Sequence, residues 1–592
     1  MNILGISLGH DSSASVVENG RILGILEAER YFRQKRYKLH CVTLEPGKHL
    51  AGFQLVDVDD LRRFLSMVTR EWGTRFDAIA VQNQGRADEL ANLLTLLGDA
   101  GIAFREVRHV DHHLAHASLA YYTSPFADAL VLSYDGMGND GFTVLFKGSG
   151  STIEYLEQDP HQFGRSYNNL GYMLGVHPDI AGSTAGKVMG LAGYAESRPD
   201  WRPFASEYVA RYAKLPPRPV AGVTSYGKGH RINSLALERI PELQPFVREV
   251  DDEPVGIRAK LASLAGRGRT RELHLPGPEH PLAQALAHTV QDAWSEEVLA
   301  LLRRFRARSR NISVVGGCAL NGVTNYQIEH QSLFERTHFL PNPTDCGLAA
   351  GAALHAYYRL SGTRFEGHAD YLTPYLGVEP FDRTDLPALQ RRFPNRRIDG
   401  GDARLAGVLA ALIHRDAIVG VIRGPYEVGP RALGNRSILC NPLNPAMRQI
   451  LNDRVKHREW YRPFAPVVTA EDASRFFTNA ADIPYMSVIC FTRPECRALL
   501  PSVTHADGSA RVQTIQRDHH PFLHATLKSF ERLSGVPVLL NTSVNPGGEP
   551  ILNYCAVGLE MLNTTDLDLV LIDDVLFSRE GKEHLLAVAA EL

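Results

Sequence analysis

The sequence predicts an α/β protein of more than one domain. Through the first third of the chain, short apolar runs of strand length alternate with helical patterns. Two units of strand, polar turn and strand recur in that region, which predicts duplicated halves facing a cleft. The 592 residues also exceed what a single hydrophobic core organises.

The predicted elements of the first third follow from where apolar residues fall. Apolar residues recur at the spacing of one helix face over residues 61–68. Polar turns are expected at residues 9–13 and, rich in glycine, at 135–141. Glycine allows the positive φ with which a backbone presents N–H groups to an oxyanion, although an ordinary hairpin has the same pattern. Strands are expected at residues 2–7, 14–17, 21–26, 78–81, 129–133 and 142–146.

The middle of the chain contains a long predicted helix and a predicted domain boundary. Apolar residues at helical spacing over 282–301 lead into a strand at 312–315. That strand ends in Gly316 and Gly317, and a Gly-Gly turn between strand and helix is typical of phosphate binding. Polar, turn-forming residues place the boundary near residue 370, giving domains of 1–370 and 371–592. The Pro-, Gly- and Arg-rich stretch 216–271 is expected to be a surface excursion.

Composition argues against several kinds of partner. Lys and Arg number 63 against 66 acidic residues, so the net charge of -3 creates no global field for nucleic acid or an anionic membrane. Any anion must therefore be held by a local cluster. Seven cysteines without a CxxC pair predict packing thiols in a reducing compartment. With neither a membrane-length apolar run nor a signal-peptide pattern, a cytoplasmic location is expected.

A pair of histidines gives the sharpest local signal. His112 and His116 lie four apart in a helical pattern, so both imidazoles share a face, as two ligands of one metal require. A pair of structural histidines has the same spacing. Asp135 and Asp345 stand at turns from which they can point into a cleft, or act only as turn and capping residues. Imidazole and carboxylate ligands without cysteine suit Fe(II), Mn or Zn.

His10 lies in the first polar turn, at the mouth of the expected cleft. Because histidine titrates near neutral pH, it can accept a proton from a hydroxyl nucleophile. A turn histidine without a chemical role is the alternative. The basic and aromatic run at residues 29–38 is interpreted as a solvated face.

Beyond residue 370 the informative residues are basic and amide side chains in loops rich in Gly and Pro. Arginine forks and lysine charges fixed by such loops suit a polyphosphate or another phosphate dianion. Their concentration in loops favours anion binding over surface solvation. The cations and amides stand within residues 429–437, at Lys456, Arg458, Arg462 and Arg511, and within residues 541–545.

Together these motifs resemble a known family, the O-carbamoyltransferases of the nodulation-protein-U and cephalosporin-carbamoyltransferase type, which includes enzymes acting on tobramycin and albicidin. The resemblance runs along nearly the whole chain, and the joint order of the motifs carries it. They lie at residues 10–13, 112–117, 135–136, 186–192, 316–321, 345–354, 429–437, 456–464 and 541–545.

The resemblance implies a fold and an activity. The N-terminal domain would be a duplicated α/β domain of the actin and sugar-kinase type, and the C-terminal domain would be α/β and similar to YrdC, which makes threonylcarbamoyladenylate. The C-terminal domain would combine carbamoyl phosphate and ATP, the latter with Mg²⁺, into carbamoyladenylate. The N-terminal domain would pass the carbamoyl group to a hydroxyl of a small-molecule natural product. No nucleic acid or membrane partner is implied, and a homodimer is left open.

The resemblance also implies residue roles. Fe²⁺, or another divalent metal, would be held by His112, His116, Asp135 and Asp345, with His10 as the base that deprotonates the acceptor hydroxyl. Nucleotide contacts in the N-terminal domain would come from Lys187, Gly316, Gly317 and Asn321. Contacts to carbamoyl phosphate and ATP in the C-terminal domain would come from Arg431, Arg436, Lys456, Arg462, Arg511, Asn541, Ser543 and Asn545.

Three other functions remain open from the sequence. A small-molecule kinase of the same fold explains the glycine turns but not the paired histidines. A tRNA threonylcarbamoyl enzyme would be expected to carry a broad basic face, which the net charge of -3 does not favour. A nucleotide sensor or chaperone-like ATPase would not need a transition metal.

Overall fold

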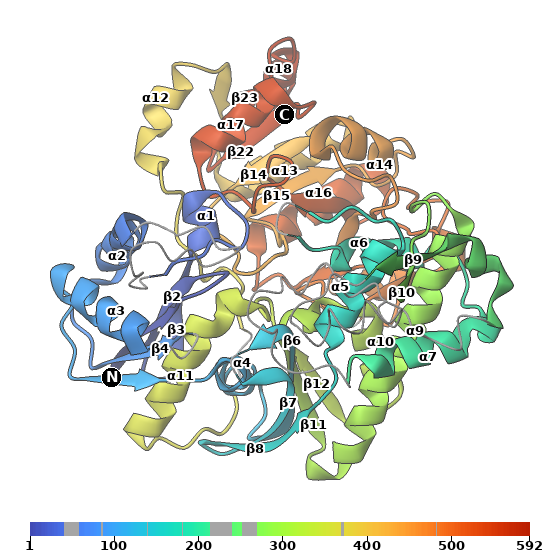
Figure 1. Ribbon diagram of the computed structural model, residues 1–592. Helices are drawn as coiled ribbons and strands as arrows, with labels where there is room; N and C mark the ends of the chain where they lie inside the picture. Colours follow the sequence, from blue (N-terminus) through green and yellow to red (C-terminus); the bar gives the residue numbers. More distant parts are fainter. Residues whose placement is uncertain are drawn as a thin grey trace.

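Two five-stranded sheets and one eight-stranded sheet, with helices packed on them, form the framework of this computed structural model (Figure 1). The structure describes residues 1–40, 58–83, 87–138, 140–179, 182–213, 239–251, 269–368, 372–480 and 482–592. Strands and helices alternate through both N-terminal and C-terminal parts, so the predicted α/β class is confirmed.

The first sheet has the strand order β3-β2-β1-β4-β5. Its central strand β1 pairs antiparallel with β2 and parallel with β4, and both β1 and β4 are apolar and buried because helices cover the sheet. The helical face predicted over residues 61–68 is buried in α2. The elements are β1 (Asn2–Ser7), β2 (Ser13–Glu18), β3 (Arg21–Glu27), α1 (Ala28–Phe32), α2 (Val58–Trp72), β4 (Ala78–Gln82), α3 (Ala87–Asp99) and β5 (Glu106–His109).

The second sheet repeats this order as β8-β7-β6-β11-β12. The pairing directions repeat as well, since β6 is antiparallel to β7 and parallel to β11. The predicted duplication is therefore confirmed. The elements are α4 (His112–Tyr122), β6 (Asp128–Gly138), β7 (Gly141–Ser149), β8 (Thr152–Asp159), α5 (Phe163–Met173), α6 (Ala185–Ala192), α7 (Arg202–Arg211), α9 (Pro281–Phe305), β11 (Asn311–Val315), α10 (Gly322–His330) and β12 (Arg336–Phe339).

Close packing of two helices joins the duplicated halves. Helix α11 (Leu348–Ser361) lies against both α4 and β1. A Cβ atom at Gly351 would lie 2.0 Å from the carbonyl oxygen of Ala115, and one at Gly5 would lie 1.9 Å from that of Ala349. Glycine at these positions lets the backbones touch, so the start of α11 is held directly beside α4.

The eight-stranded sheet forms the C-terminal part, in the order β13-β23-β22-β14-β15-β21-β16-β20. Helices α13 and α16 pack together on it and close an apolar core. The main elements are β13 (Asn395–Arg397), α13 (Gly401–His414), β14 (Val419–Ile422), β15 (Arg436–Cys440), β16 (Ala465–Thr469), β20 (Gln513–Ile515), α16 (Pro521–Ser534), β21 (Val538–Ser543), α17 (Cys555–Thr564), β22 (Leu569–Ile572), β23 (Val575–Ser578) and α18 (His584–Glu591).

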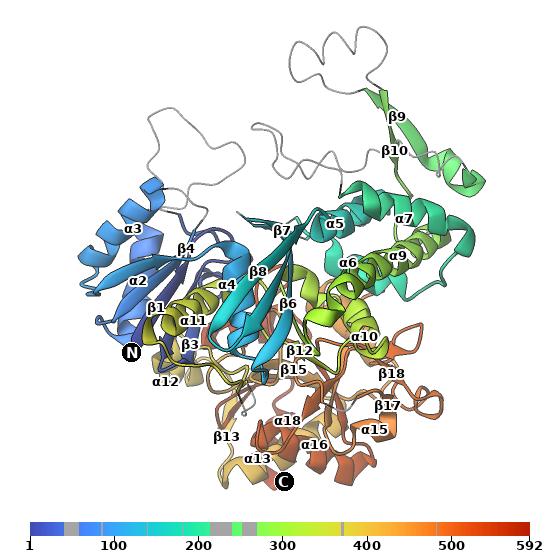
Figure 2. The same ribbon diagram turned by 90° about the horizontal axis from the view of Figure 1, so that it is seen from below.

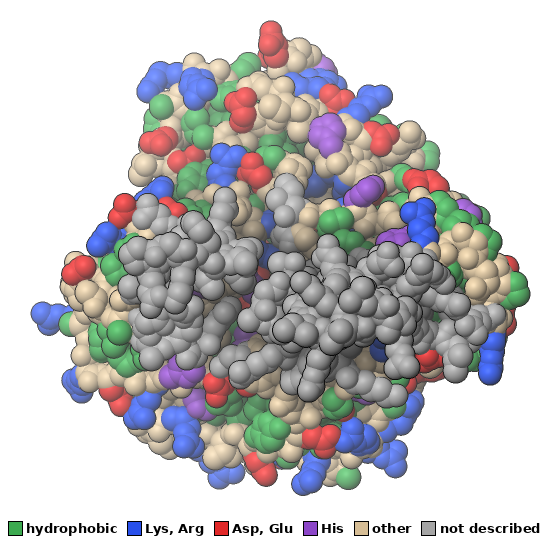
Figure 3. All heavy atoms as spheres, viewed as in Figure 1, with side chains coloured by type: hydrophobic (Ala, Val, Ile, Leu, Met, Phe, Trp, Pro, Cys, Tyr) green, Lys and Arg blue, Asp and Glu red, His purple; other side chains and the backbone are tan. Residues whose placement is uncertain are grey.

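Some predicted features fall wholly or partly outside the described residues. The boundary expected at residue 370 lies outside them, as does most of the stretch 216–271. The described part of that stretch includes β9 (Val247–Asp251), which pairs with β10 (Arg269–Leu273) in a two-stranded ladder extending away from α7 and α9 (Figure 2). Among the described helices, none has the length and apolar character needed to cross a membrane. Both signs of charge are interspersed over the described part of the face in Figure 3.

Candidate metal centre and cationic site

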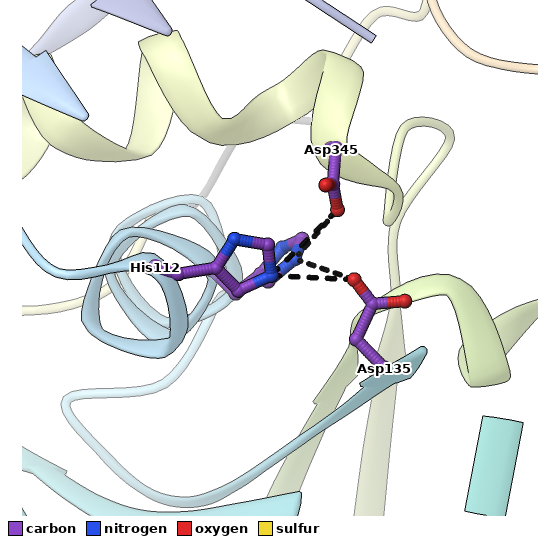
Figure 4. A group of neighbouring side chains, drawn as sticks. His112, Asp135 and Asp345 are labelled. Atoms are coloured by element: carbon purple, nitrogen blue, oxygen red, sulfur yellow. Dashed lines mark hydrogen bonds and ion pairs between the residues drawn. The ribbon is translucent and has the colours of Figure 1, made fainter. Parts of the chain in front are cut away.

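Two histidines and two aspartates converge between the duplicated halves (Figure 4). His112 Nε2 lies 3.3 Å from Asp135 Oδ2 and 3.7 Å from Asp345 Oδ1. His116 Nε2 lies 3.5 Å and 3.3 Å from the same two oxygens. One ligand atom from each side chain lies within 4.8 Å of the others, and all four residues are buried. The structure thus brings together the four residues that the sequence analysis named as metal ligands.

Separate elements deliver these four side chains. His112 and His116 lie one turn apart on α4, so both rings project from the same face. Asp135 lies within β6, which continues through residues that were expected to form a turn, with irregular pairing to β7. Asp345 opens a 3-10 turn directly before α11, and the close packing of α11 on α4 sets its carboxylate against the imidazoles.

Gly316 and Gly317 hold Asp135 in place. Gly316 has a φ of +94°, and a Cβ atom there would lie 2.2 Å from the carbonyl oxygen of Tyr134. The backbone N–H of Gly317 donates to Asp135 Oδ1 at 3.0 Å. The nucleotide contacts implied for these glycines stay a prediction, and the structure gives them a positioning role at the cluster.

The four side chains perturb one another strongly. Burial raises the pKa of Asp135, but contacts with His112 and His116 outweigh it and hold that pKa well below its usual range. Burial lowers the pKa of His116, while Asp135 and Asp345 raise it to about 9. Burial and the charge of Asp135 raise the pKa of Asp345. Two buried carboxylates thus face each other and need positive charge between them.

A divalent cation fits this donor set. The completely buried His116 makes no hydrogen bond through either ring nitrogen. Buried polar atoms without partners are costly, and a metal ion satisfies imidazole nitrogens and carboxylate oxygens together. Two nitrogen and two oxygen donors without a thiolate suit Fe²⁺, Mn²⁺ or Zn²⁺.

His10 lies beside this cluster. Its Nδ1 atom is 3.0 Å from Asp11 Oδ2 and 3.3 Å from Asp345 Oδ2, and its side chain is 39% exposed. Burial lowers the pKa of His10, but Asp345 and Asp11 raise it to about 9. Positive charge bound between the histidines and Asp345 would oppose protonation of His10. The imidazole therefore has both the exposure and the contact with the cluster that a general base at a metal centre needs.

Lys187 and Asn321 have other partners than the two glycines. Lys187, on α6, forms an ion pair with Glu459 of the C-terminal part. Asn321 caps α10, with its Oδ1 accepting from the N–H of Thr324 at 3.1 Å and its Nδ2 donating to Gln291 at 3.1 Å. The nucleotide contacts implied for Lys187 and Asn321 stay predictions.

The C-terminal part contains a second site, made of cations. Lys456 ends a π-helical turn (Leu451–Lys456), a distortion that often marks functional positions. Its Nζ donates to Ser543 O at 2.8 Å and Asn545 Oδ1 at 2.6 Å. Burial lowers the pKa of Lys456 well below its usual value, and the charges of Arg458 and Arg462 lower it further. The structure thus groups three of the predicted contacts around one buried ammonium.

Two more arginines face the same region. Burial lowers the pKa of Arg431 well below its usual value, and the charges of Arg511 and Arg462 add to the effect. Burial and Arg462 lower the pKa of Arg511 to about 10, and its Nε atom is buried without a hydrogen-bond partner. Cations that repel one another around the buried Lys456 are stabilised by a bound anion, so this cluster is a candidate phosphate site.

Arg436 and Asn541 form hydrogen bonds within the C-terminal part. Arg436 is completely buried and directs its five N–H donors to the side chain of Asn553 and to backbone carbonyls, which leaves it no donor for a ligand. Asn541 donates to Ala432 O at 3.0 Å and Gln513 Oε1 at 2.8 Å. The Oδ1 atom of Asn541 is buried without a partner. The contacts implied for these two residues stay predictions.

The basic run at residues 29–38 is not a solvated face throughout. Arg30 is 1% exposed, so the interpretation of that run as a solvated face is wrong for this residue. Burial lowers the pKa of Lys35, and the charge of Arg462 lowers it further, whereas the charge of Asp179 raises it. Arg511 Nη2 also lies 3.9 Å from Met189 Sδ on α6. The N-terminal part therefore borders the C-terminal site, a proximity no local sequence signal reports.

Comparison with known proteins assigns the chain to a family. The model described as Carbamoyltransferase N-terminus matches residues 82–214 and 258–354, and Carbamoyltransferase C-terminus matches residues 410–579. Nodulation protein NolO of Bradyrhizobium diazoefficiens is 30% identical over 82% of this chain and 82% of its own length. Nodulation protein U of Rhizobium tropici is 28% identical over 99% of this chain and 98% of its own length. Nodulation protein NolNO of Sinorhizobium fredii is 29% identical over 96% and 79%.

Likeness to solved structures is more distant. A ROK hexokinase from Thermus thermophilus is matched over 61% of this chain and 100% of its own, with 16% sequence identity and a TM-score of 0.29. The two family models and the relatives that span most of the chain carry the assignment: the protein is an enzyme of the carbamoyltransferase family to which the nodulation proteins U and NolO belong.

Proposed function

We propose that this carbamoyltransferase is an ATP-dependent O-carbamoyltransferase with two active centres. The observation that carries the proposal is that one chain holds a buried N/O ligand set in its N-terminal part and a cationic cluster around the buried Lys456 in its C-terminal part. A single phosphoryl transfer would not need both. Two steps that share an activated intermediate use each of them.

The first step belongs to the cationic cluster. Carbamoyl phosphate and ATP, as its Mg²⁺ complex, together carry many negative charges, and the cluster supplies several cations around the buried Lys456. One water cleaves carbamoyl phosphate to carbamate and phosphate. A carbamate oxygen then bonds to the α-phosphorus of ATP and pyrophosphate leaves, which gives carbamoyladenylate. Lys456, held by Ser543 and Asn545, and Arg511 are the residues to which we assign contact with these anions.

The second step belongs to the metal-ligand cluster. His112, His116, Asp135 and Asp345 would hold Fe²⁺ or another divalent ion, which supplies positive charge for the phosphate and carbonyl oxygens of the adenylate. His10 removes the proton from the acceptor hydroxyl. The new C–O bond forms between that oxygen and the carbamoyl carbon, and AMP leaves. The acceptor class we propose is a hydroxylated small-molecule natural product.

The N-terminal and C-terminal parts are in contact beside the cationic cluster, which favours direct transfer of carbamoyladenylate, an intermediate that water hydrolyses. Lys187 and Met189 of α6 contact Glu459 and Arg511 of the C-terminal part. Adenylate made at the cationic cluster therefore starts its transfer next to N-terminal residues. Enclosure of this kind limits hydrolysis of a reactive intermediate.

Product analysis tests this proposal. The metal-loaded protein is incubated with carbamoyl phosphate, Mg-ATP and a panel of hydroxylated natural products as acceptors, and AMP and pyrophosphate are measured. We expect both to form only when carbamoyl phosphate is present. Lys456→Met should abolish their formation, whereas Lys582→Met, which changes a partly exposed lysine 3.2 Å from Asp568, should not. Formation of ADP in place of AMP would indicate a kinase and overturn the proposal.

A further inference from the structure

A buried ion pair of the N-terminal part contacts the C-terminal part. Glu27 ends β3 and Arg30 lies on α1, the short helix that borders the C-terminal part in Figure 1. Both side chains are completely buried, and Arg30 Nε lies 2.5 Å from Glu27 Oε2. Burial lowers the pKa of Arg30, but Glu27 raises it above its ordinary value, so the guanidinium stays charged.

The Glu27–Arg30 pair forms hydrogen bonds with one loop of the C-terminal part, at Glu427 and Gly429. Arg30 Nη2 donates to the carbonyls of Glu427 and Gly429 at 2.8 Å and 2.7 Å. Glu27 Oε1 accepts from the N–H of Gly429 at 2.7 Å. The guanidinium also lies 4.6 Å from the ring of Tyr426, whose hydroxyl accepts from the N–H of Glu27 at 2.9 Å. Both backbone polar groups of Gly429 are therefore bonded to side chains of the N-terminal part.

The same loop carries Arg431 between two anchors. Gly429, on one side, is held by Glu27 and Arg30. On the other side, Ala432 O accepts from Asn541 Nδ2 at 3.0 Å. Like charges on other arginines repel Arg431 and, with burial, lower its pKa. Fixing the backbone on both sides of Arg431 opposes this repulsion.

The pair also touches the loops of the metal-ligand cluster. The N–H of Ala28, between Glu27 and Arg30, donates to Ser12 O at 2.9 Å, just after the turn that carries His10. Gly429 adopts a φ of +91°, and a Cβ atom there would lie 2.3 Å from Pro341 O, in the segment leading to Asp345. The buried contact between the Glu27–Arg30 pair and Gly429 therefore lies against the segments that carry the proposed residues of both centres.

We propose that Glu27 and Arg30 are positioning residues for Arg431, so that the anion site of the C-terminal part is complete only with the N-terminal part docked on it. The proposal rests on the proposed function, because it takes Arg431 to contact carbamoyl phosphate. Arg30 acts through the loop backbone and itself touches no substrate.

Exchange of labelled pyrophosphate into ATP, dependent on carbamoyl phosphate, isolates the first step in the full chain and needs no acceptor. Arg30→Lys keeps the charge next to Glu27 but loses the planar fork that holds two carbonyls. We expect the KM for carbamoyl phosphate to rise roughly 10- to 100-fold, with kcat within about threefold of wild type. Tyr426→Phe, a milder change at the same joint, should raise KM about two- to tenfold.

Arg33→Ala is the matched control. Arg33 follows α1 and forms a largely exposed bidentate pair with Glu549 across the same border, at 3.0 Å and 2.8 Å, without contacting the loop. It should leave KM unchanged. A fall in kcat with constant KM in both Arg30→Lys and Tyr426→Phe would show a merely structural role and overturn the inference. Absence of exchange in the wild type would instead overturn the proposed function, so the two failures are distinguishable.

Discussion

The Nδ1 atom of His10 lies 3.3 Å from the Oδ2 atom of Asp345. The other oxygen of Asp345 faces α4, 3.3 Å from His116 Nε2. One carboxylate therefore contacts both the proposed base and the metal-ligand cluster. A change of charge at the cluster therefore alters the protonation of His10 through this contact.

His10→Asn should separate the two steps. The change removes the proton acceptor but keeps a polar side chain near Asp345. We expect carbamoyl transfer to fall by about 10²- to 10⁴-fold, because a positioned base contributes that much. Exchange of pyrophosphate into ATP should stay within about twofold of wild type. Acceptor-stimulated AMP release, measured with the most effective alcohol in a panel of hydroxylated natural products, reports the transfer step. Equal loss of both steps would refute the assignment.

Removing a ligand should empty the metal centre. His116→Ala deletes a completely buried imidazole whose nitrogens have no hydrogen-bond partner, and Asp345→Asn neutralises a carboxylate that faces both histidines. We expect each variant to lose at least about tenfold in metal affinity. Elemental analysis after dialysis against limiting iron measures the loss.

His524→Gln is the control for metal content. His524 contacts Glu471 at 2.7 Å in the C-terminal part, away from the ligand set. It should retain the metal content of the wild type. Full metal content in His116→Ala would show that the cluster is structural and that the metal is bound elsewhere.

Gly351→Ala should separate α11 from α4. The added methyl would lie 2.0 Å from Ala115 O, so the helices must move apart and Asp345 moves with α11. We expect a loss of about 1–3 kcal/mol in unfolding free energy and weaker metal binding. Gly98→Ala is the control, because a Cβ atom there has no neighbour within 4 Å and alanine favours the helix. Equal stability of the two variants would contradict the packing described for α11.

A pH-dependent contribution to stability is expected from Asp472. Burial raises the pKa of Asp472, but contacts with Thr469, Arg475 and Lys528 outweigh it and lower the pKa to about 2. The unfolded value is about 3.9, so the stabilisation is present above about pH 4 and disappears as the pH falls towards 2. Asp472→Asn should cost about 1–2 kcal/mol near neutral pH, since Arg475 is half exposed.

Denaturant unfolding of wild type and Asp472→Asn at about pH 7 and about pH 3 measures this difference. The gap between the two proteins should shrink at the lower pH. A constant gap would mean that the charge of Asp472 contributes nothing to it.

Local sequence patterns predicted much of the fold. The helices at residues 61–68 and 282–301 were predicted because an amphipathic face and a long apolar period are local properties, and both are present in α2 and α9. The extension of β6 through Asp135 was not predicted. Glycines suggested a turn there, whereas the strand runs on to Gly138, with its pairing to β7 interrupted between Tyr134 and Gly138.

The site residues divide in the same way. His112 and His116 could be paired from their spacing because a helix brings residues four apart together. The burial of Arg30 and Arg436 could not be predicted, since each has partners in a distant segment and the same side chain on the surface would look identical in the sequence. Lys187 likewise meets Glu459 only through the docking of α6 on the C-terminal part.

Pyrophosphate exchange into ATP in three proteins tests most directly whether two centres share an adenylate. We expect exchange that requires carbamoyl phosphate in the wild type and in His10→Asn, and none in Lys456→Met. Exchange that persists in Lys456→Met, or that does not require carbamoyl phosphate, would contradict the division of the reaction between the two parts of the chain.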